Sequence, residues 1–193
     1  TGLDFSFLSN RLNGSVDYYI KWGDDLFGTA PVDYTAIPSK GVMRNIAAMK
    51  SKGIDVNLNA TIPLGSLIRF NPQLMINFNS SKVTDYHFDG TYAYQFLSNG
   101  TSVNGQIGVP VYSILAYRSL GLDNLGNPVG ELEGEPSIDY QKIRLQDKSV
   151  LEYKGSVVPR YSGYFNPGVT VGSFDFTVGM LYKFGYVFKA NSV

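Results

Sequence analysis

Apolar and polar residues alternate along several stretches of this chain, with the two-residue period of a β-strand. In RLNGSVDYYIKWGDDL, the even positions from Leu12 to Trp22 are apolar apart from a glycine, and the odd positions from Asn13 to Lys21 are mostly polar. Successive side chains leave a pleated backbone on opposite sides, so the pattern predicts a strand with one apolar and one polar face. Seven strands are predicted, at about 3–8, 12–22, 53–62, 68–78, 111–121, 161–171 and 174–184.

The connections between the predicted strands are of two kinds. Short turns fall near 9–11, 63–66 and 172–173, and long loops fall at about 23–52, 80–110 and 122–159. Because two long loops come in succession, the last is expected to contain an irregular strand near SIDYQKIRL. Within 68–78, Pro72 removes one ladder donor, which a central strand tolerates poorly.

The solvent of the apolar faces decides the fold class. Structureless loops of this length count against a globular domain, whereas an outer-membrane barrel combines short turns, long loops and strands of roughly 10 residues with apolar side chains outward. The polar row Asp55, Asn57, Asn59 and Thr61 suits a water-filled lumen. Tyr18 or Tyr19 and Trp22 suit a membrane interface. The alternative is a sheet with one solvated side in a soluble β-sandwich, such as a carbohydrate-binding module.

Composition favours a β protein and excludes several functions. The chain has 21 Gly, 14 Tyr and 12 Phe, and only 17% of its 193 residues are charged. Sixteen basic residues balance sixteen acidic ones, so nucleic acid is not an expected partner. The absence of cysteine excludes disulfides, thiolate zinc sites and cysteine nucleophiles. No apolar run is long enough for a membrane-spanning helix, and the chain opens inside a predicted strand, as expected for a piece of a longer protein.

Four motifs in order resemble the SusC/RagA-like TonB-linked outer-membrane transporters. They are GLDFSFLSNRLNGSVDYYIKWGDDL, RNIAAMKSKGIDVNLNATI, GQIGVPVYSILAYRSLGLDNLGNPVG and VVPRYSGYFNPGVTVGSFDFTVGMLYKFGYVF, which together cover most of the chain. Ala47, Ala48 and Ser51 depart from the Gly and Asn common in that family, and the stretch ELEGEPSIDY has no fixed counterpart.

This resemblance implies an all-β fold of antiparallel up-and-down strands forming part of a large transmembrane outer-membrane β-barrel. In that family the barrel has about 22 strands and holds a plug. Residues 1–193 would then be a barrel segment without a plug, whose edge strands pair with the rest of its own barrel. The implied function is import of glycans or peptides for nutrient uptake across the outer membrane of a Gram-negative bacterium. The implied partners are the lipid bilayer, the plug, TonB and a SusD-like surface lipoprotein.

Candidate chemistry is sparse, and the sequence predicts no enzyme. His87 is the only histidine, which excludes a two-histidine metal site. The acids Asp24, Asp25, Glu131, Glu133 and Glu135 are interpreted as solvated loop charge, and residues 123–127 as a turn rather than a calcium loop. No catalytic, cofactor-binding or metal-binding residue is predicted, and no substrate-binding residue is assigned. Loop aromatics either stack on a sugar or peptide or pack the loops against each other or a partner lipoprotein: Tyr34, Tyr86, Tyr92, Tyr94 and Phe96.

Overall fold

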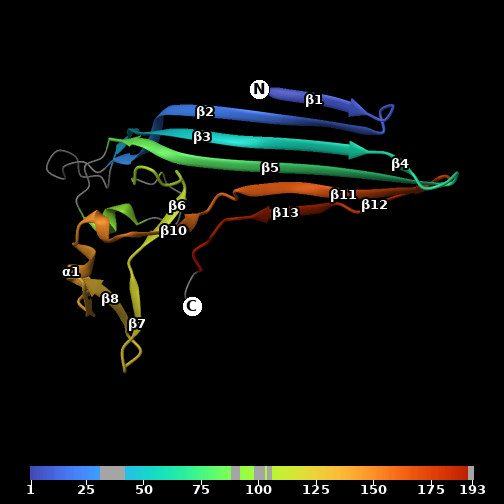
Figure 1. The fold of residues 1–193 in the computed structure, drawn as a ribbon. Helices are drawn as coiled ribbons and strands as arrows, with labels where there is room; N and C mark the ends of the chain where they lie inside the picture. The colour runs from blue at the N-terminus through green and yellow to red at the C-terminus, as the bar shows by residue number, and fades with distance from the viewer. Residues whose placement is uncertain (31–41, 88–91, 98–102, 104–105, 191–193) are drawn as a thin grey trace. The chain divides into compact units, whose positions relative to one another are not determined.

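The computed structural model describes residues 1–30, 42–87, 92–97, 103 and 106–190 and confirms an all-β fold. Its largest element is an eight-stranded antiparallel sheet of order β1-β2-β3-β5-β11-β12, in which β13 also pairs with β11 and β4 with β5 (Figure 1). The strands are β1 (Gly2–Phe7), β2 (Leu12–Ala30), β3 (Val42–Ala60), β4 (Ile62–Pro63), β5 (Ile68–Tyr86), β11 (Tyr161–Val171), β12 (Phe174–Thr177) and β13 (Met180–Phe184).

The chain divides into two compact units, which are described separately. The first comprises residues 1–21, 51–80 and 159–186, and the second comprises 22–50, 81–158 and 187–193. The nine buried apolar side chains of the described residues all belong to the second unit. The sheet of the first unit therefore has no apolar core of its own among these residues.

Three strands are longer than the alternation predicts. β2 continues to Ala30, β3 already begins at Val42, and β5 continues to Tyr86, so the expected loops at 23–52 and 80–110 are partly strand. In β2, Asp25 adopts a left-handed backbone conformation (φ 57°), so the turn-like sequence Gly-Asp-Asp interrupts the strand geometry without ending the strand. In β3, consecutive Ile46 and Ala47 are both buried, which removes the alternation.

Pro72 lies in a central strand, contrary to the sequence-based expectation. β5 pairs with β3 on one side and β11 on the other, and Pro72 lies directly opposite Pro167 of β11. The backbone bonds from Asn79 to Arg160 and from Gly172 to Leu67, each 2.9 Å, make this a non-hydrogen-bonded pair. Neither proline therefore removes a bond from the β5–β11 ladder. The nitrogen of Pro167 faces the opposite neighbour, where β12 ends at Thr177 and β13 begins at Met180.

Three aromatic rings in the first unit lie over a glycine of the neighbouring strand. Phe5 covers Gly14, where an added Cβ would be 2.6 Å from both the Phe5 ring and the carbonyl oxygen of Asn57. Tyr19 lies over Gly53 in the same way, and Tyr182 lies over Gly163. Tyr182 also donates its hydroxyl hydrogen to the carbonyl oxygen of Met75, at 2.8 Å. These glycines let a ring span the neighbouring strand and reach the next one.

The second unit contains two small sheets where one strand and one loop were predicted. Residues 111–121 form parts of different sheets: β6 (Ser113–Ala116) pairs with β10 (Glu152–Ser156), and β7 (Ser119–Leu122) pairs with β8 (Pro128–Leu132), which also pairs with β9 (Glu135–Ser137). The expected irregular strand near SIDYQKIRL is instead helix α1 (Tyr140–Arg144). It begins where the Asp139 side chain accepts a hydrogen bond from the Lys142 amide, an N-cap that the alternation did not reveal.

The second unit has its own apolar core. Ala93, Phe96, Leu115 and Leu151 form a buried cluster to which the single-turn 3₁₀ helix η1 (Ala93–Phe96) contributes two members. A second such helix, η2 (Lys148–Val150), precedes β10. Among the residues described, no helix is long and apolar enough to cross a membrane.

Candidate functional site

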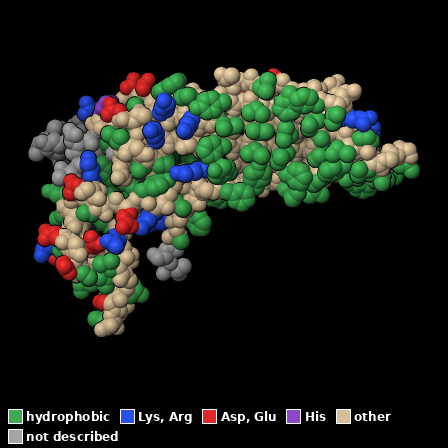
Figure 2. Space-filling model, viewed as in Figure 1, with side chains coloured by type: hydrophobic (Ala, Val, Ile, Leu, Met, Phe, Trp, Pro, Cys, Tyr) green, Lys and Arg blue, Asp and Glu red, His purple; other side chains and the backbone are tan. Residues whose placement is uncertain are grey.

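One face of the sheet in the first unit is apolar along its whole height. Since paired residues share a face, the registers of β5, β11, β12 and β13 define cross-strand rows. Phe174 and Phe176, at one end of this face, are 71% and 61% exposed. Figure 2 shows hydrophobic side chains gathered over the strands of this unit. The rows run from one end to the other as Ile68, Val171, Phe174; Phe70, Val169, Phe176; Leu74, Phe165, Met180; Ile76, Gly163, Tyr182; and Phe78, Tyr161, Phe184.

The opposite face is polar and its side chains hydrogen bond across strands. Asn57 of β3 donates to Ser15 of β2 at 3.3 Å, and Asn77 of β5 donates to Asp55 of β3. Further along, Asn71 donates to the Thr170 hydroxyl at 3.0 Å, and that hydroxyl donates to Asp175 at 2.6 Å. The predicted row of Asp and Asn on β3 is thus confirmed as part of a network that extends over the neighbouring strands.

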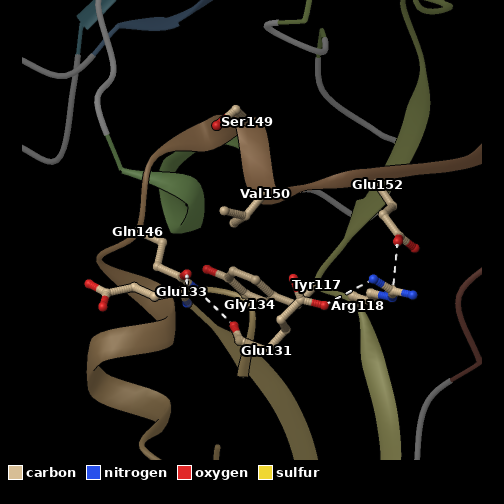
Figure 3. A pocket seen from close by; sticks show the side chains of 9 residues that line it. All are labelled: Tyr117, Arg118, Glu131, Glu133, Gly134, Gln146, Ser149, Val150 and Glu152. Carbon is tan, nitrogen blue, oxygen red and sulfur yellow. Dashed lines mark hydrogen bonds and ion pairs between the residues drawn. The ribbon is translucent and has the colours of Figure 1, made fainter. Parts of the chain in front are cut away.

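The second unit contains a polar pocket of about 280 Å³. We define the polar pocket by its nine lining residues: Tyr117, Arg118, Glu131, Glu133, Gly134, Gln146, Ser149, Val150 and Glu152. Figure 3 shows that they come from the segment after β6, the β8–β9 hairpin, the segment after α1, and β10. Sequence reasoning gave no signal for this site, because its residues become neighbours only through the two small sheets.

Arg118 lies between two carboxylates of the pocket. Its Nη1 is 3.1 Å from Oε2 of Glu131, and its Nε is 3.9 Å from Oε1 of Glu152 (Figure 3). Glu152 also accepts a hydrogen bond from Lys154, and this bond, together with the charges of Lys154 and Arg118, holds the pKa of Glu152 below its usual value. Glu131 and Glu152 are therefore ionised at neutral pH, with their orientation set by cations.

Gln146 fixes the wall formed by the β8–β9 hairpin. Its side-chain oxygen accepts from the Glu133 amide at 3.1 Å, and its Nε2 donates to the carbonyl oxygen of Glu131 at 2.9 Å. Glu133 and Gly134 form the two-residue turn with φ values of 54° and 89°, as a tight hairpin requires. The Glu133 carboxylate has no ion pair or hydrogen bond among the described residues.

The acids and the histidine singled out from the sequence do not form one site. Glu131 and Glu133 both line the polar pocket, whereas Glu135 does not. His87 is exposed and lies 3.7 Å from Asp85, and the described residues hold no group of three potential metal ligands. Residues 123–127 form the predicted turn, in which Oδ1 of Asp123 accepts from the amides of Leu125 and Asn127, each at 2.8 Å.

The loop aromatics serve mainly as packing residues. Tyr86 and Phe96 pack together with ring centroids 6.4 Å apart, and Phe96 is buried in the core of the second unit. Tyr92 and Tyr94 stack on each other at 6.1 Å and stay partly exposed. Tyr34 lies outside the described residues.

Comparisons with known proteins agree with this architecture. No family model matches the chain. It is 24% identical over 139 residues to the TonB-dependent receptor SusC of Bacteroides thetaiotaomicron, a match that covers 66% of this chain and 14% of SusC. The RagAB peptide transporter matches its fold with a TM-score of 0.73 at 21% identity, over 95% of this chain and 20% of the other. The RagAB peptide importer in its closed-closed state matches with a TM-score of 0.72 at 22% identity.

The fold and the two-faced sheet define the chain as part of the wall of a large antiparallel β-barrel, with the sheet left open because the segment is partial. The comparisons narrow the class: the chain is a segment of a SusC/RagA-like TonB-dependent receptor. It spans about a seventh of the SusC sequence and a fifth of the RagAB chains that it matches. The resemblance predicted from the four motifs is thereby confirmed.

Proposed function

We propose that this chain forms part of the barrel of a TonB-dependent transporter in the outer membrane of a Gram-negative bacterium. In this role the apolar face contacts lipid, the polar face lines the solute path, and the second unit belongs to the extracellular mouth. The transported solutes are glycans or peptides, and the protein acts by transport rather than catalysis. A surface lipoprotein, TonB and a plug domain complete the system, as the likeness to SusC and RagAB suggests.

The single observation that carries this proposal is the height of the exposed apolar face. β11 has 11 residues, so its rows span about 34 Å along the strand at about 3.4 Å per residue. A strand tilted by about 45° then covers roughly 25 Å along the membrane normal, which matches the apolar band of outer-membrane barrels. Aromatic rings lie near both ends of the face, with Phe174 and Phe176 at one end and Tyr161 and Phe184 at the other. Aromatic girdles at both interfaces are typical of such barrels.

The soluble β-sandwich is the second candidate, and burial argues against it. A sandwich covers the apolar face of each sheet with a second layer, which buries those side chains. In the first unit, no apolar side chain of the described residues is buried. Hydrocarbon is the solvent that makes such a face favourable, because exposing it to water costs roughly 25 cal/mol per Å².

Cysteine scanning tests the orientation directly, because this chain contains no cysteine. Single cysteines replace Phe174, Asp175, Phe176 and Thr177 in turn, in the natural-length protein reconstituted into vesicles. Each carries a bimane label, and both a water-soluble quencher and a nitroxide-labelled lipid are applied. We expect lipid quenching at 174 and 176 and aqueous quenching at 175 and 177. Equal aqueous quenching at all four positions would contradict the proposal.

A further inference from the structure

The polar pocket of the second unit offers both hydrogen-bond donors and acceptors to a ligand. Arg118 has five N–H donors, of which Glu131 and Glu152 occupy only a part. Glu133 contributes a carboxylate that is not paired with any described residue. Donors and acceptors thus face one cavity, and neither set is saturated.

Tyr117 provides a second and independent observation at the same place. Its hydroxyl is buried and finds no hydrogen-bond partner among the described residues. Buried hydroxyls in folded proteins almost always have a partner, which is a protein group, a water or a ligand. The Tyr117 ring and Val150 meanwhile give the cavity an apolar wall (Figure 3).

The lining discriminates between classes of ligand. An anion would meet three carboxylates against the single guanidinium of Arg118. A cation would satisfy Glu133, but it would leave the Tyr117 hydroxyl and the spare N–H groups of Arg118 without acceptors. A neutral polyhydroxylated ring supplies donors and acceptors at once, and its C–H face suits an apolar wall.

We propose that the polar pocket binds one sugar residue of a neutral glycan. A cavity of about 280 Å³ suits a single ring with its hydroxyls. The hydrogen bonds of Gln146 fix the hairpin wall, and Arg118 orients two of the carboxylates, so little ordering is needed on binding. The inference rests on the proposed transport function for its biological meaning, and it makes the solute a glycan rather than a peptide.

The test measures binding to the purified natural-length protein in detergent by saturation-transfer NMR and calorimetry. The probes are the methyl glycosides of glucose, galactose, mannose and xylose, with trilysine and trialanine as comparators. We expect at least one glycoside to bind and both peptides to fail. Glu133→Gln and Tyr117→Phe should each weaken that binding by about tenfold, the loss expected for one hydrogen bond.

Glu135→Gln is the matched control, because Glu135 follows the same hairpin turn but does not line the pocket. It should bind the glycoside as well as the parent protein does. Two variants on different elements are used because either one alone could perturb local folding. Glycoside binding that both variants leave unchanged, binding of none of the four glycosides, or preferential binding of trilysine would overturn the proposal. Lipid quenching on the sheet is measured separately, so failure of the pocket and failure of the transporter assignment are distinguishable.

Discussion

Alanine at Gly53 tests whether the tyrosine that spans this glycine holds three strands together. Gly53 is buried on the polar face of β3, and the Tyr19 ring from β2 lies over it. An alanine Cβ would lie 2.5 Å from the carbonyl oxygen of Phe78 on β5 and closer still to the Tyr19 ring. Real Cβ atoms do not approach that closely, so the ring must move. The backbone carbonyl cannot move without disturbing the ladder.

The cost can be worked from two losses. Moving the ring breaks the hydrogen bond from Asn79 to the Tyr19 hydroxyl, 3.1 Å long, which is worth about 1 kcal/mol. Overpacking against the Phe78 carbonyl adds typically 1–3 kcal/mol. The better strand propensity of alanine returns about 0.5–1 kcal/mol. The net expectation for Gly53→Ala is a loss of about 1–3 kcal/mol in the free energy of unfolding.

Gly179→Ala is the matched control and has the opposite expected sign. Its new Cβ would have only the end of the Asn166 side chain close by, at 3.2 Å, and the backbone there is not left-handed. We therefore expect it to be neutral or to stabilise by up to about 1 kcal/mol. The assay is urea unfolding of the natural-length protein in lipid vesicles, followed by circular dichroism. If Gly53→Ala is as stable as Gly179→Ala, the ring over Gly53 does not couple the strands.

Three further predictions concern the lipid face, the turn and the pocket wall. Phe165→Arg, in a middle row of the apolar face, should destabilise vesicle-embedded protein by about 2–4 kcal/mol, whereas Phe174→Arg at the end row should cost at most about 1 kcal/mol; equal costs in urea unfolding would argue against a membrane midplane near Phe165. Hydrogen bonds from the side chain and amide of Asn127 lower the pKa of Asp123, so its carboxylate stabilises the turn above the unfolded pKa, near 3.8, and this contribution is lost as the pH falls through the lowered folded value; amide exchange at Leu125 and Asn127 should accelerate only in acid, and a profile flat down to pH 2 would refute this. Gln146→Leu removes the hydrogen bonds to the β8–β9 hairpin and should accelerate exchange of the Glu133 amide by about tenfold or more, with Gln141→Leu unchanged as the control.

The sequence predicted the sheet of the first unit because the faces of its strands differ in solvent. Alternation located 161–171 and 174–184, and the structure adds only a break opposite Pro167. The expectation for Pro72 was wrong, because a proline weakens a central strand only where its nitrogen faces a paired neighbour. That direction depends on the parity of the ladder, which one strand alone does not reveal.

The second unit could not be predicted in the same way. Ile46 and Ala47 are buried on both sides of β3, so the pattern that marks a half-buried strand disappears there. Arg118, Glu131, Gln146 and Glu152 are far apart in the sequence and meet only through β6–β10 pairing and the β7–β8–β9 sheet. Glu131 and Glu133 attracted notice as charge, but no sequence signal linked them to Arg118 or Tyr117.

The two units differ in what makes them stable. The second unit buries Phe96, Leu115 and Leu151 around its short elements, so its conformation has an apolar core that holds in water. The first unit buries no apolar side chain among the described residues, and its strands are joined by backbone ladders, glycine-spanning rings and a polar network. Backbone hydrogen bonds replace equivalent bonds to water and contribute little net free energy there, whereas in hydrocarbon an unpaired group is very costly. The ladders of the first unit therefore become decisive once lipid surrounds the apolar face. A solute pocket in the water-facing second unit does not depend on lipid, so ligand binding to the pocket should survive detergents that loosen the sheet.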